Sequence, residues 1–355
     1  MTQEPDPDDL TQHSADQRYQ HWRAAYQRWR QAQLPPADAL ARLRSDAREA
    51  TTALEAPTRA WIERTYGLPM PAHLFTFWAF WRGLSPSEHQ ATKRFVFPAG
   101  LFDFFQEGGR ERVPRAGLDH RLAWRHYLDP PEFLTILTGR MDGLHYGLWY
   151  DSPQALPSYV ARYYSREPDA IRCNGRTVLE ALSTHVERAL RDWYPPANTQ
   201  EAEGDLFPTW LVRDAIAEYE TVDREARGSA PFDDFLHEAS RQRLATCNEM
   251  GVVIPAPYDH SIPHSRDAIY DAIRSDAPEV AEWIMEAARA CAQGQPAFAL
   301  VLGHDLHWLS ADREPREEAA WRLLTRAYEV LGYDALAAIA TLHHQHRHLP
   351  SVNVY

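Results

Sequence analysis

Cysteine is scarce in this 355-residue sequence, and its three copies, Cys173, Cys247 and Cys291, lie far apart. Their odd number and wide spacing favour reduced thiols over a disulfide framework, as is typical of a cytoplasmic protein. They also exclude a zinc site built from cysteine pairs. The sequence further lacks an apolar run of membrane-spanning length, and residues 1–16 contain neither a cationic nor an apolar region. We therefore expect no signal peptide, no membrane contact and a cytoplasmic location.

Lysine is almost absent, because Lys93 is the only one and all other basic residues are arginine. Together with 26 prolines and abundant alanine, this composition suggests a GC-rich bacterial genome. Acidic residues outnumber basic residues by 50 to 37, which gives a formal net charge of -13. Such a charge repels phosphate backbones and anionic membrane surfaces, so direct nucleic-acid binding is disfavoured.

The common catalytic signatures are missing as well. The sequence contains no phosphate-binding glycine loop, no GxSxG motif, no HExxH motif and no CxxC pair. We therefore expect no enzyme of a common class, no cofactor and no metal. The hydrophobic fraction of 44% is ordinary for a globular protein, and 12 Trp, 16 Tyr and 13 Phe predict a core rich in aromatic side chains.

The pattern of apolar residues predicts an α+β protein. We expect N-terminal helices, then an antiparallel or mixed sheet domain with packed helices, then a mostly helical C-terminal domain. The predicted parts are a disordered leader (1–16), an N-terminal helical region (17–66), an α+β domain (67–194), a polar linker (195–208) and the helical C-terminal domain (209–355).

Aromatic and proline spacing defines the first helices. Aromatic residues recur at steps of three and four in a stripe that predicts helix packing, at Tyr19, Trp22, Tyr26 and Trp29. Leu34-Pro35-Pro36 ends this helix, and Pro57 divides the next helical stretch into 37–56 and 58–66. Residues 74–81 follow two prolines and are apolar nearly all round, which predicts a deeply buried helix.

Short apolar runs cut by Gly, Pro and Asp predict the strands, at 95–97, 122–128, 133–137 and 145–150. Asp142-Gly143 predicts a hairpin turn within 140–143, and Asn174-Gly175 predicts a turn before a helix at 177–193. A short strand is predicted at 252–254. The helices predicted beyond the linker are 209–225, 233–250, 266–274, 278–292, 315–330 and 333–346.

Three polar clusters could carry chemistry. The first is His304, Asp305 and His307, where two imidazoles at helical spacing could form part of a metal site oriented by the carboxylate. The favoured alternative is a helix or loop end with surface histidines. The second is the run 343–348, which could bind a metal weakly, but cationic residues at a helix C-terminus are already favourable there.

The third cluster is the polar loop 258–264. Its Asp259-His260 pair could perform acid-base chemistry, although nothing nearby in sequence supplies a nucleophile. A solvated loop or a loop that contacts a partner is the favoured interpretation.

One segment carries a family resemblance: Trp124-Arg125-His126-Tyr127-Leu128-Asp129-Pro130-Pro131-Glu132-Phe133. It resembles the Trp-Arg-x-Tyr-x-Asp-Pro-Pro-Glu-Phe run of the histone PARylation factor family, and further matches extend from about Tyr66 to Arg347. The motif's own chemistry is structural, since the prolines impose an extended bend, Asp129 can cap it and the aromatic side chains pack. The apolar helix at 74–81 is also similar to the start of the SUKH immunity-protein superfamily.

The resemblance implies a site that this sequence alters. Eukaryotic members of the family bind a poly(ADP-ribose) polymerase and complete its active site with a glutamate, which directs modification toward serine. The family's Asp-Glu pair falls on Ala292 and Gln293, and neither side chain can deprotonate a hydroxyl. The nearest acids upstream are Glu282 and Glu286.

The family's docking pair is altered too. Its Tyr-Arg pair falls on Asp259 and His260, which reverses or weakens the charge presented to a partner.

Three hypotheses follow. The first is a non-catalytic accessory factor that binds a protein, an ADP-ribosyltransferase, through a surface of Asp259, His260, Gln293, His304, Asp305 and His307. The second is a SUKH-like immunity protein that neutralises a bacterial toxin. The third keeps an enzymatic contribution from Glu282, Glu286 or the His304, Asp305 and His307 cluster within a composite site.

Overall fold

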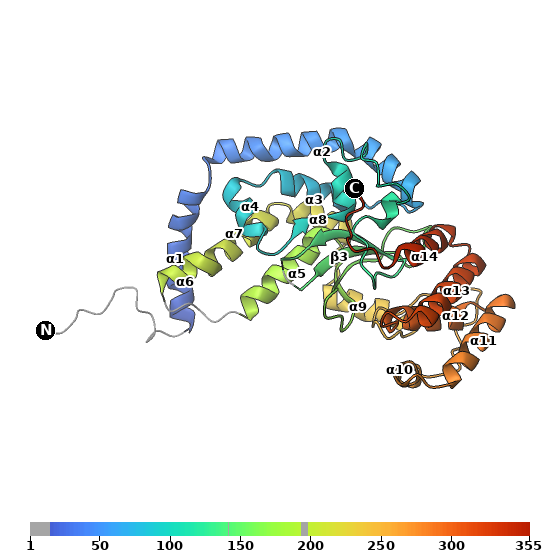
Figure 1. The fold of residues 1–355 in the computed structure, drawn as a ribbon. Coiled ribbons are helices and arrows are strands. Elements are labelled where there is room, and N and C mark those ends of the chain that lie inside the picture. Colours follow the sequence, from blue (N-terminus) through green and yellow to red (C-terminus); the bar gives the residue numbers. More distant parts are fainter. Residues whose placement is uncertain (1–14, 141, 193–197) are drawn as a thin grey trace. The chain divides into compact units, whose positions relative to one another are not determined.

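The structure, a computed structural model, describes residues 15–140, 142–192 and 198–355. It confirms the α+β class, with many helices and one antiparallel sheet (Figure 1). Contacts divide the chain into two compact units. The first unit comprises residues up to 55, 72–97 and 177–228, and the second comprises 56–71, 98–176 and 229–355. The boundaries of these units differ from the domain boundaries expected from the sequence. The expected division into domains stays a prediction.

The first unit is helical. Its helices are α1 (Ala15–Gln33), the first part of α2 (Ala37–Tyr66), α3 (His73–Arg82), α4 (Pro86–Thr92), α5 (Val178–Arg191), α6 (Thr199–Glu201), the π-helical turn η3 (Ala202–Leu206), α7 (Phe207–Ala217) and α8 (Glu220–Arg227). The aromatic stripe of α1 packs on α7, where the rings of Tyr26 and Trp210 lie 5.3 Å apart and Trp22 contacts Phe207. The predicted burial of α3 is confirmed.

Two predictions about helix ends in this part of the chain are wrong. Pro57 does not end a helix, because α2 continues through it to Tyr66. The proline removes one backbone hydrogen bond, but buried side chains before and after it, such as Ala47 and Ile62, stabilise the helix on both sides. Residues 198–208, predicted as linker, are helical because Asn198 caps α6 by accepting a hydrogen bond from the Glu201 N–H. The remainder of that linker, 195–197, and the leader up to residue 14 lie outside the described residues.

The second unit holds the sheet. Its strands are β1 (Phe97–Pro98, at the junction with the first unit), β2 (Phe133–Thr138), β3 (Leu144–Trp149), β4 (Tyr159–Tyr164) and β5 (Arg172–Gly175), in the order β1-β2-β3-β4-β5. Antiparallel registers pair Leu134 with Leu148, and Leu148 with Val160. The predicted hairpin is confirmed, since β2 and β3 pair antiparallel and Asp142 and Gly143 adopt positive φ angles of 56° and 70°. Met141 of this turn lies outside the described residues.

Other strand and turn predictions in this unit are wrong. Residues 122–128 form no strand, because η2 (His120–Leu122) is followed by turns in which Trp124 has a φ of 57°. Asn174-Gly175 ends β5 instead of forming a turn, and 252–254 contributes only an isolated bridge between Leu244 and Val252.

Between residues 209 and 250 the helices are shorter than predicted, whereas those after residue 265 that were predicted have nearly the predicted bounds. In the first unit, the helix predicted at 209–225 is divided at Glu218–Tyr219 between α7 and α8. The second unit contains η1 (Gly100–Phe105), α9 (Phe232–Arg241), α10 (Arg266–Ser275), α11 (Glu279–Ala292), α12 (Ala297–Trp308), α13 (Glu314–Leu331) and α14 (Asp334–His346). Helix α12 was not predicted. Within the described residues, no helix has both the length and the apolar character needed to cross a membrane.

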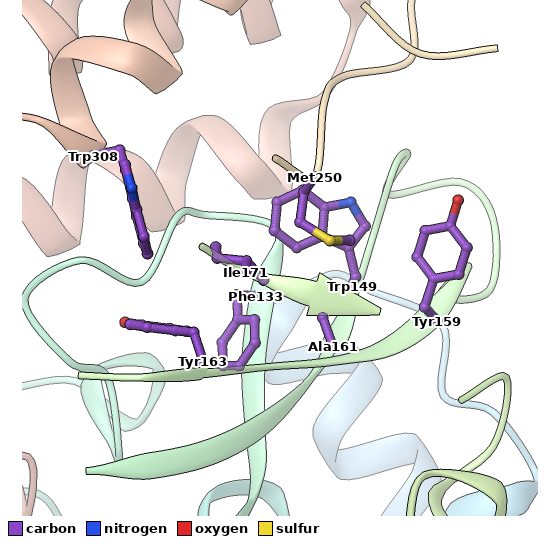
Figure 2. Close-up of a cluster of buried hydrophobic side chains, with 8 residues drawn as sticks. All are labelled: Phe133, Trp149, Tyr159, Ala161, Tyr163, Ile171, Met250 and Trp308. Carbon is purple, nitrogen blue, oxygen red and sulfur yellow. The ribbon is translucent and has the colours of Figure 1, made fainter. Parts of the chain in front are cut away.

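An aromatic cluster forms the core between the sheet and the later helices (Figure 2). It joins side chains of the sheet region to two residues from farther along the chain, and its members are Phe133, Trp149, Tyr159, Ala161, Tyr163, Ile171, Met250 and Trp308. The rings of Tyr163 and Trp308 lie 5.3 Å apart, nearly edge to face. The first residue of β2 and the last residue of α12 are therefore buried in one core.

Candidate functional site

Side-chain hydrogen bonds fix the conformation of the motif at 124–133. The guanidinium of Arg125 donates to the carbonyl oxygens of Pro130 and Phe133, each at 3.1 Å. The indole N–H of Trp124 donates to Asp103 at 2.9 Å, and the Thr135 hydroxyl donates to the Trp124 carbonyl at 2.8 Å. The Arg125 guanidinium thus gives the backbone of this segment hydrogen bonds in addition to those of its turns.

Asp129 is fully buried beside the sheet. It accepts hydrogen bonds from His145 Nε2 at 2.9 Å, the Tyr163 hydroxyl at 2.6 Å and the His126 N–H at 2.8 Å. Burial alone would raise the pKa of this carboxyl, but the charge and hydrogen bond of His145, together with further nearby cationic groups such as Arg125, hold the pKa below its usual value. Asp129 is therefore an internal ion partner and is closed to solvent.

Glu132 makes the longest connection of the motif. Its Oε1 lies 3.0 Å from His304 Nε2 and also accepts a hydrogen bond from the Tyr328 hydroxyl. Burial lowers the pKa of His304, yet the Glu132 carboxylate raises it above its usual value. The motif, α12 and α13 thus share one buried polar network.

The other two residues of the His304 cluster are also buried, so the interpretation as surface histidines is wrong. Helix α12 is buried along its whole length because its sequence, AFALVLGHDLHW, is apolar on every side apart from this cluster. Asp305 accepts a hydrogen bond from the Cys247 N–H at 2.6 Å, and burial raises its pKa to about 7. Burial also holds the pKa of His307 well below its usual value. None of the three side chains is exposed to a partner or substrate.

The exposed part of the predicted surface is a loop and a helix that contact each other. Asp259 and His260 are exposed in the loop 258–264. His264 of this loop stacks on Trp283 of α11, with ring centroids 4.2 Å apart, and its Nε2 lies 3.4 Å from Glu286. Glu282 and Glu286 are exposed on α11, and Gln293 is exposed where this helix ends.

The histidine run 343–348 is distributed over several environments. Helix α14 ends at His346, as predicted. His343 is buried, whereas His344 stacks on Trp321 with ring centroids 4.7 Å apart and lies 3.0 Å from Glu318. His348 lies 2.9 Å from Glu317. The run therefore does not form a single six-residue metal-binding patch.

Sequence reasoning missed the partners of the motif. Tyr328 and Glu317 are ordinary helix residues in the sequence, and His145 lies in an apolar strand. The only available indication was the presence of two carboxylates, Asp129 and Glu132, in an apolar segment, because buried acids require partners. Which partners they have depends on the fold.

The comparisons with known proteins agree with the motif. The family described as Histone PARylation factor 1 matches residues 57–211. The mouse (Mus musculus) Histone PARylation factor 1 is 31% identical over 135 residues, which cover 37% of this chain and 39% of that protein. The cattle (Bos taurus) and zebrafish (Danio rerio) proteins of that name are each 30% identical, over 135 and 125 residues. The resemblance is thus confirmed over the part containing the motif, and the chain spans about two fifths of the length of the curated relatives it matches.

Proposed function

We propose that this chain is a non-catalytic accessory factor that binds an ADP-ribosyltransferase. The observation that supports this proposal most is that residues 57–211, which contain the complete motif from Trp124 to Phe133, match the family described as Histone PARylation factor 1. Fold similarity does not by itself transfer a function. The arrangement of exposed and buried polar groups in this chain supplies the further support.

Buried polar groups argue against an active site of the chain's own. Asp129, Glu132, His304 and Asp305 are the groups with strongly interacting charges, and all four are closed to solvent. A general acid or base must reach the proton that it transfers. We infer that these residues stabilise the fold and that any action on another protein takes place at the exposed surface.

The exposed loop 258–264 and helix α11 supply a candidate docking surface. His264 ties the loop to α11 by stacking on Trp283, so Asp259 and His260 are presented on a braced loop. The first turn of α11 contains Glu279 and Glu282, and Glu286 follows one turn later. This surface is acidic, so a partner with a basic docking surface would complement it.

Capture of a partner tests the proposal. The full chain, immobilised, should retain an ADP-ribosyltransferase from an extract of cells that carry the gene's neighbours. Asp259→Arg should weaken the purified complex by about tenfold because it reverses a charge at the interface. Asp46→Arg, which makes the same change at an exposed position of α2, should leave the affinity unchanged. Capture of a toxin, with no transferase among the specific partners, would support the immunity-protein alternative and overturn this proposal.

Gln293 supplies a second test. In the reconstituted pair, Gln293→Glu should raise serine-linked ADP-ribosylation above the level of the unaltered chain, because it restores a titratable carboxylate at the family position. Gln295→Glu adds the same charge two residues away and should have no effect. The measurement is the yield of modification that resists hydroxylamine. An equal rise with both variants would mean that charge alone, and not a placed base, changes the reaction.

A further inference from the structure

Helices α13 and α14 form an antiparallel pair that brings the residues before α13 close to the residues after α14. Only Gly332 and Tyr333 connect them, and Gly332 has a φ of 69°. Trp321 of α13 stacks on His344 of α14 and its indole N–H donates to the Thr341 hydroxyl at 3.1 Å, so the helices run side by side in opposite directions. Residues at the start of α13 therefore lie next to residues that follow α14.

Three side chains meet at this end of the helix pair. Asp312 precedes α13, Glu317 lies in its first turns and His348 follows α14. One ligand atom from each lies within 4.8 Å of the other two, and His348 Nε2 is 2.9 Å from Glu317 Oε2. Within the residues that the structure describes, this is the one group of three His, Cys, Asp or Glu side chains gathered so closely.

A hydrogen bond from Tyr127 orients the Glu317 carboxylate. Glu317 is buried, and its other oxygen, Oε1, accepts a hydrogen bond from the Tyr127 hydroxyl. The same hydroxyl accepts a hydrogen bond from the Asp312 N–H at 2.9 Å. Metal-binding carboxylates are commonly oriented by such outer hydrogen bonds. Asp312 and His348 are exposed, so an ion can enter from solvent.

A separate observation concerns two buried histidines on the inner side of Glu317. Glu317 also lines a cavity of about 10 Å³ together with His307 and His343. Both imidazoles are more than nine-tenths buried, and the Nε2 atom of each has no hydrogen-bond partner among the described residues. Buried polar atoms normally have one, and this volume is about that of one water molecule. A water bound to an ion at Glu317 would lie beside the Nε2 atoms of His307 and His343 and could form hydrogen bonds with them.

Opposing charge around the cluster is limited. Arg347 is the main nearby cation, and its guanidinium donates to the carbonyl oxygens of Tyr127 and His307 and to the Ser310 hydroxyl. Arg313 and Arg316 are engaged by Asp276. The two carboxylates of the cluster therefore keep a net negative charge that favours a cation.

We propose that Asp312, Glu317 and His348 bind one divalent transition-metal ion of the zinc class. One imidazole nitrogen and two carboxylate oxygens suit Zn²⁺, whereas Mg²⁺ and Ca²⁺ prefer oxygen ligands throughout. Three protein ligands leave a coordination position open. Asp312 also lines a cavity of about 490 Å³ with Tyr127, Trp308 and Arg316, which provides room for a water or a small ligand on the ion.

Metal titration of the full chain tests the site. Calorimetry with Zn²⁺ should show one equivalent bound, and Co²⁺ should give a visible absorption band at the same stoichiometry. His348→Ala and Asp312→Asn should each weaken binding at least about tenfold. Asp312 is exposed, so Asp312→Asn should keep the thermal midpoint of the unaltered chain without metal. His348→Ala also removes the hydrogen bond to buried Glu317 and should lower that midpoint slightly. His346→Ala, in the same histidine run but outside the cluster, is the matched control and should bind as the unaltered chain does.

Three results would overturn the site. The first is the absence of Zn²⁺ binding at micromolar concentration in the unaltered chain. The second is an equal loss of affinity in His346→Ala and His348→Ala, which would assign the binding to the histidine run as a whole. The third is unchanged affinity in Asp312→Asn, because that result would remove the carboxylate half of the site.

Discussion

Replacing Glu132 by alanine should lower the free energy of unfolding by about 3–5 kcal/mol, because it leaves a buried histidine and a buried tyrosine without their shared acceptor. His304 and Tyr328 both bond to the same Glu132 oxygen. Without the carboxylate, His304 must lose its proton and Tyr328 loses its hydrogen bond. Urea unfolding followed by tryptophan fluorescence measures the change.

Two variants separate charge from packing at this position. Glu132→Gln keeps the shape and one acceptor, so it should cost less than alanine but more than about 1 kcal/mol. Glu282→Ala removes an exposed carboxylate from α11 and should change stability by less than about 0.5 kcal/mol. A loss below about 1 kcal/mol in Glu132→Ala would show that water or another group replaces the lost partner.

Acidification from pH 7 to pH 5 should destabilise the protein well before its carboxylates titrate. Burial lowers the pKa of His73 to about 3 and of His126 to about 4, and it holds those of His307 and His343 well below the usual value. Below about pH 6.5 the unfolded chain binds protons at these positions and the folded chain does not, so stability falls as pH falls.

Two groups oppose this trend. His304, whose pKa is raised by the Glu132 carboxylate, keeps its proton to a higher pH in the folded chain than in the unfolded chain. Asp305, with its pKa raised to about 7, takes up a proton in the folded state below that pH and gains stability there. The histidines whose pKa is lowered by burial, which also include His89 and His120, outnumber these two groups, so unfolding takes up protons. The expected loss is on the order of 2–4 kcal/mol per pH unit between pH 6 and pH 5.

A single histidine can be isolated in this pH dependence. His73→Gln removes one buried imidazole whose pKa is lowered by burial alone, so the slope of unfolding free energy against pH should fall by about one proton. Urea unfolding at several pH values between 5 and 7.5 supplies the slopes. If His73→Gln kept the full slope, His73 would not be a neutral buried group.

Local sequence patterns predicted the elements that end at proline, glycine or other residues typical of turns and helix ends. Leu34-Pro35-Pro36 ended α1, Asp142-Gly143 formed the hairpin and the limits of α10 and α11 were nearly correct. Errors occurred where tertiary contacts outweigh local preference. The apolar run at 122–128 looks like a strand, but its carbonyl groups bond to side chains instead of a neighbouring strand. Trp124 accepts from the Thr135 hydroxyl, and Tyr127 accepts from the Arg347 guanidinium.

The site was predictable only in part for a similar reason. The motif could be recognised from its letters, and so could its structural role. Its partners could not, because Glu132 meets His304 across 172 residues of sequence. Helix α12 was missed since a helix that is apolar on every side has no amphipathic period to detect. Its three polar residues were therefore interpreted as surface groups.

The order in which the chain contributes to its two units has a practical consequence for work with fragments. The second unit begins at residue 56, is interrupted twice by segments of the first and ends at residue 355. A fragment from residue 56 to residue 355 contains all of the second unit. It also contains residues 72–97 and 177–228 of the first unit, but it lacks the residues before 56 that complete that unit. The segment 57–211, which matches the known family, likewise draws on both units. No single cleavage releases two intact halves, so deletion mapping of a partner-binding region would confuse lost contacts with lost folding, and point substitutions are the appropriate tool.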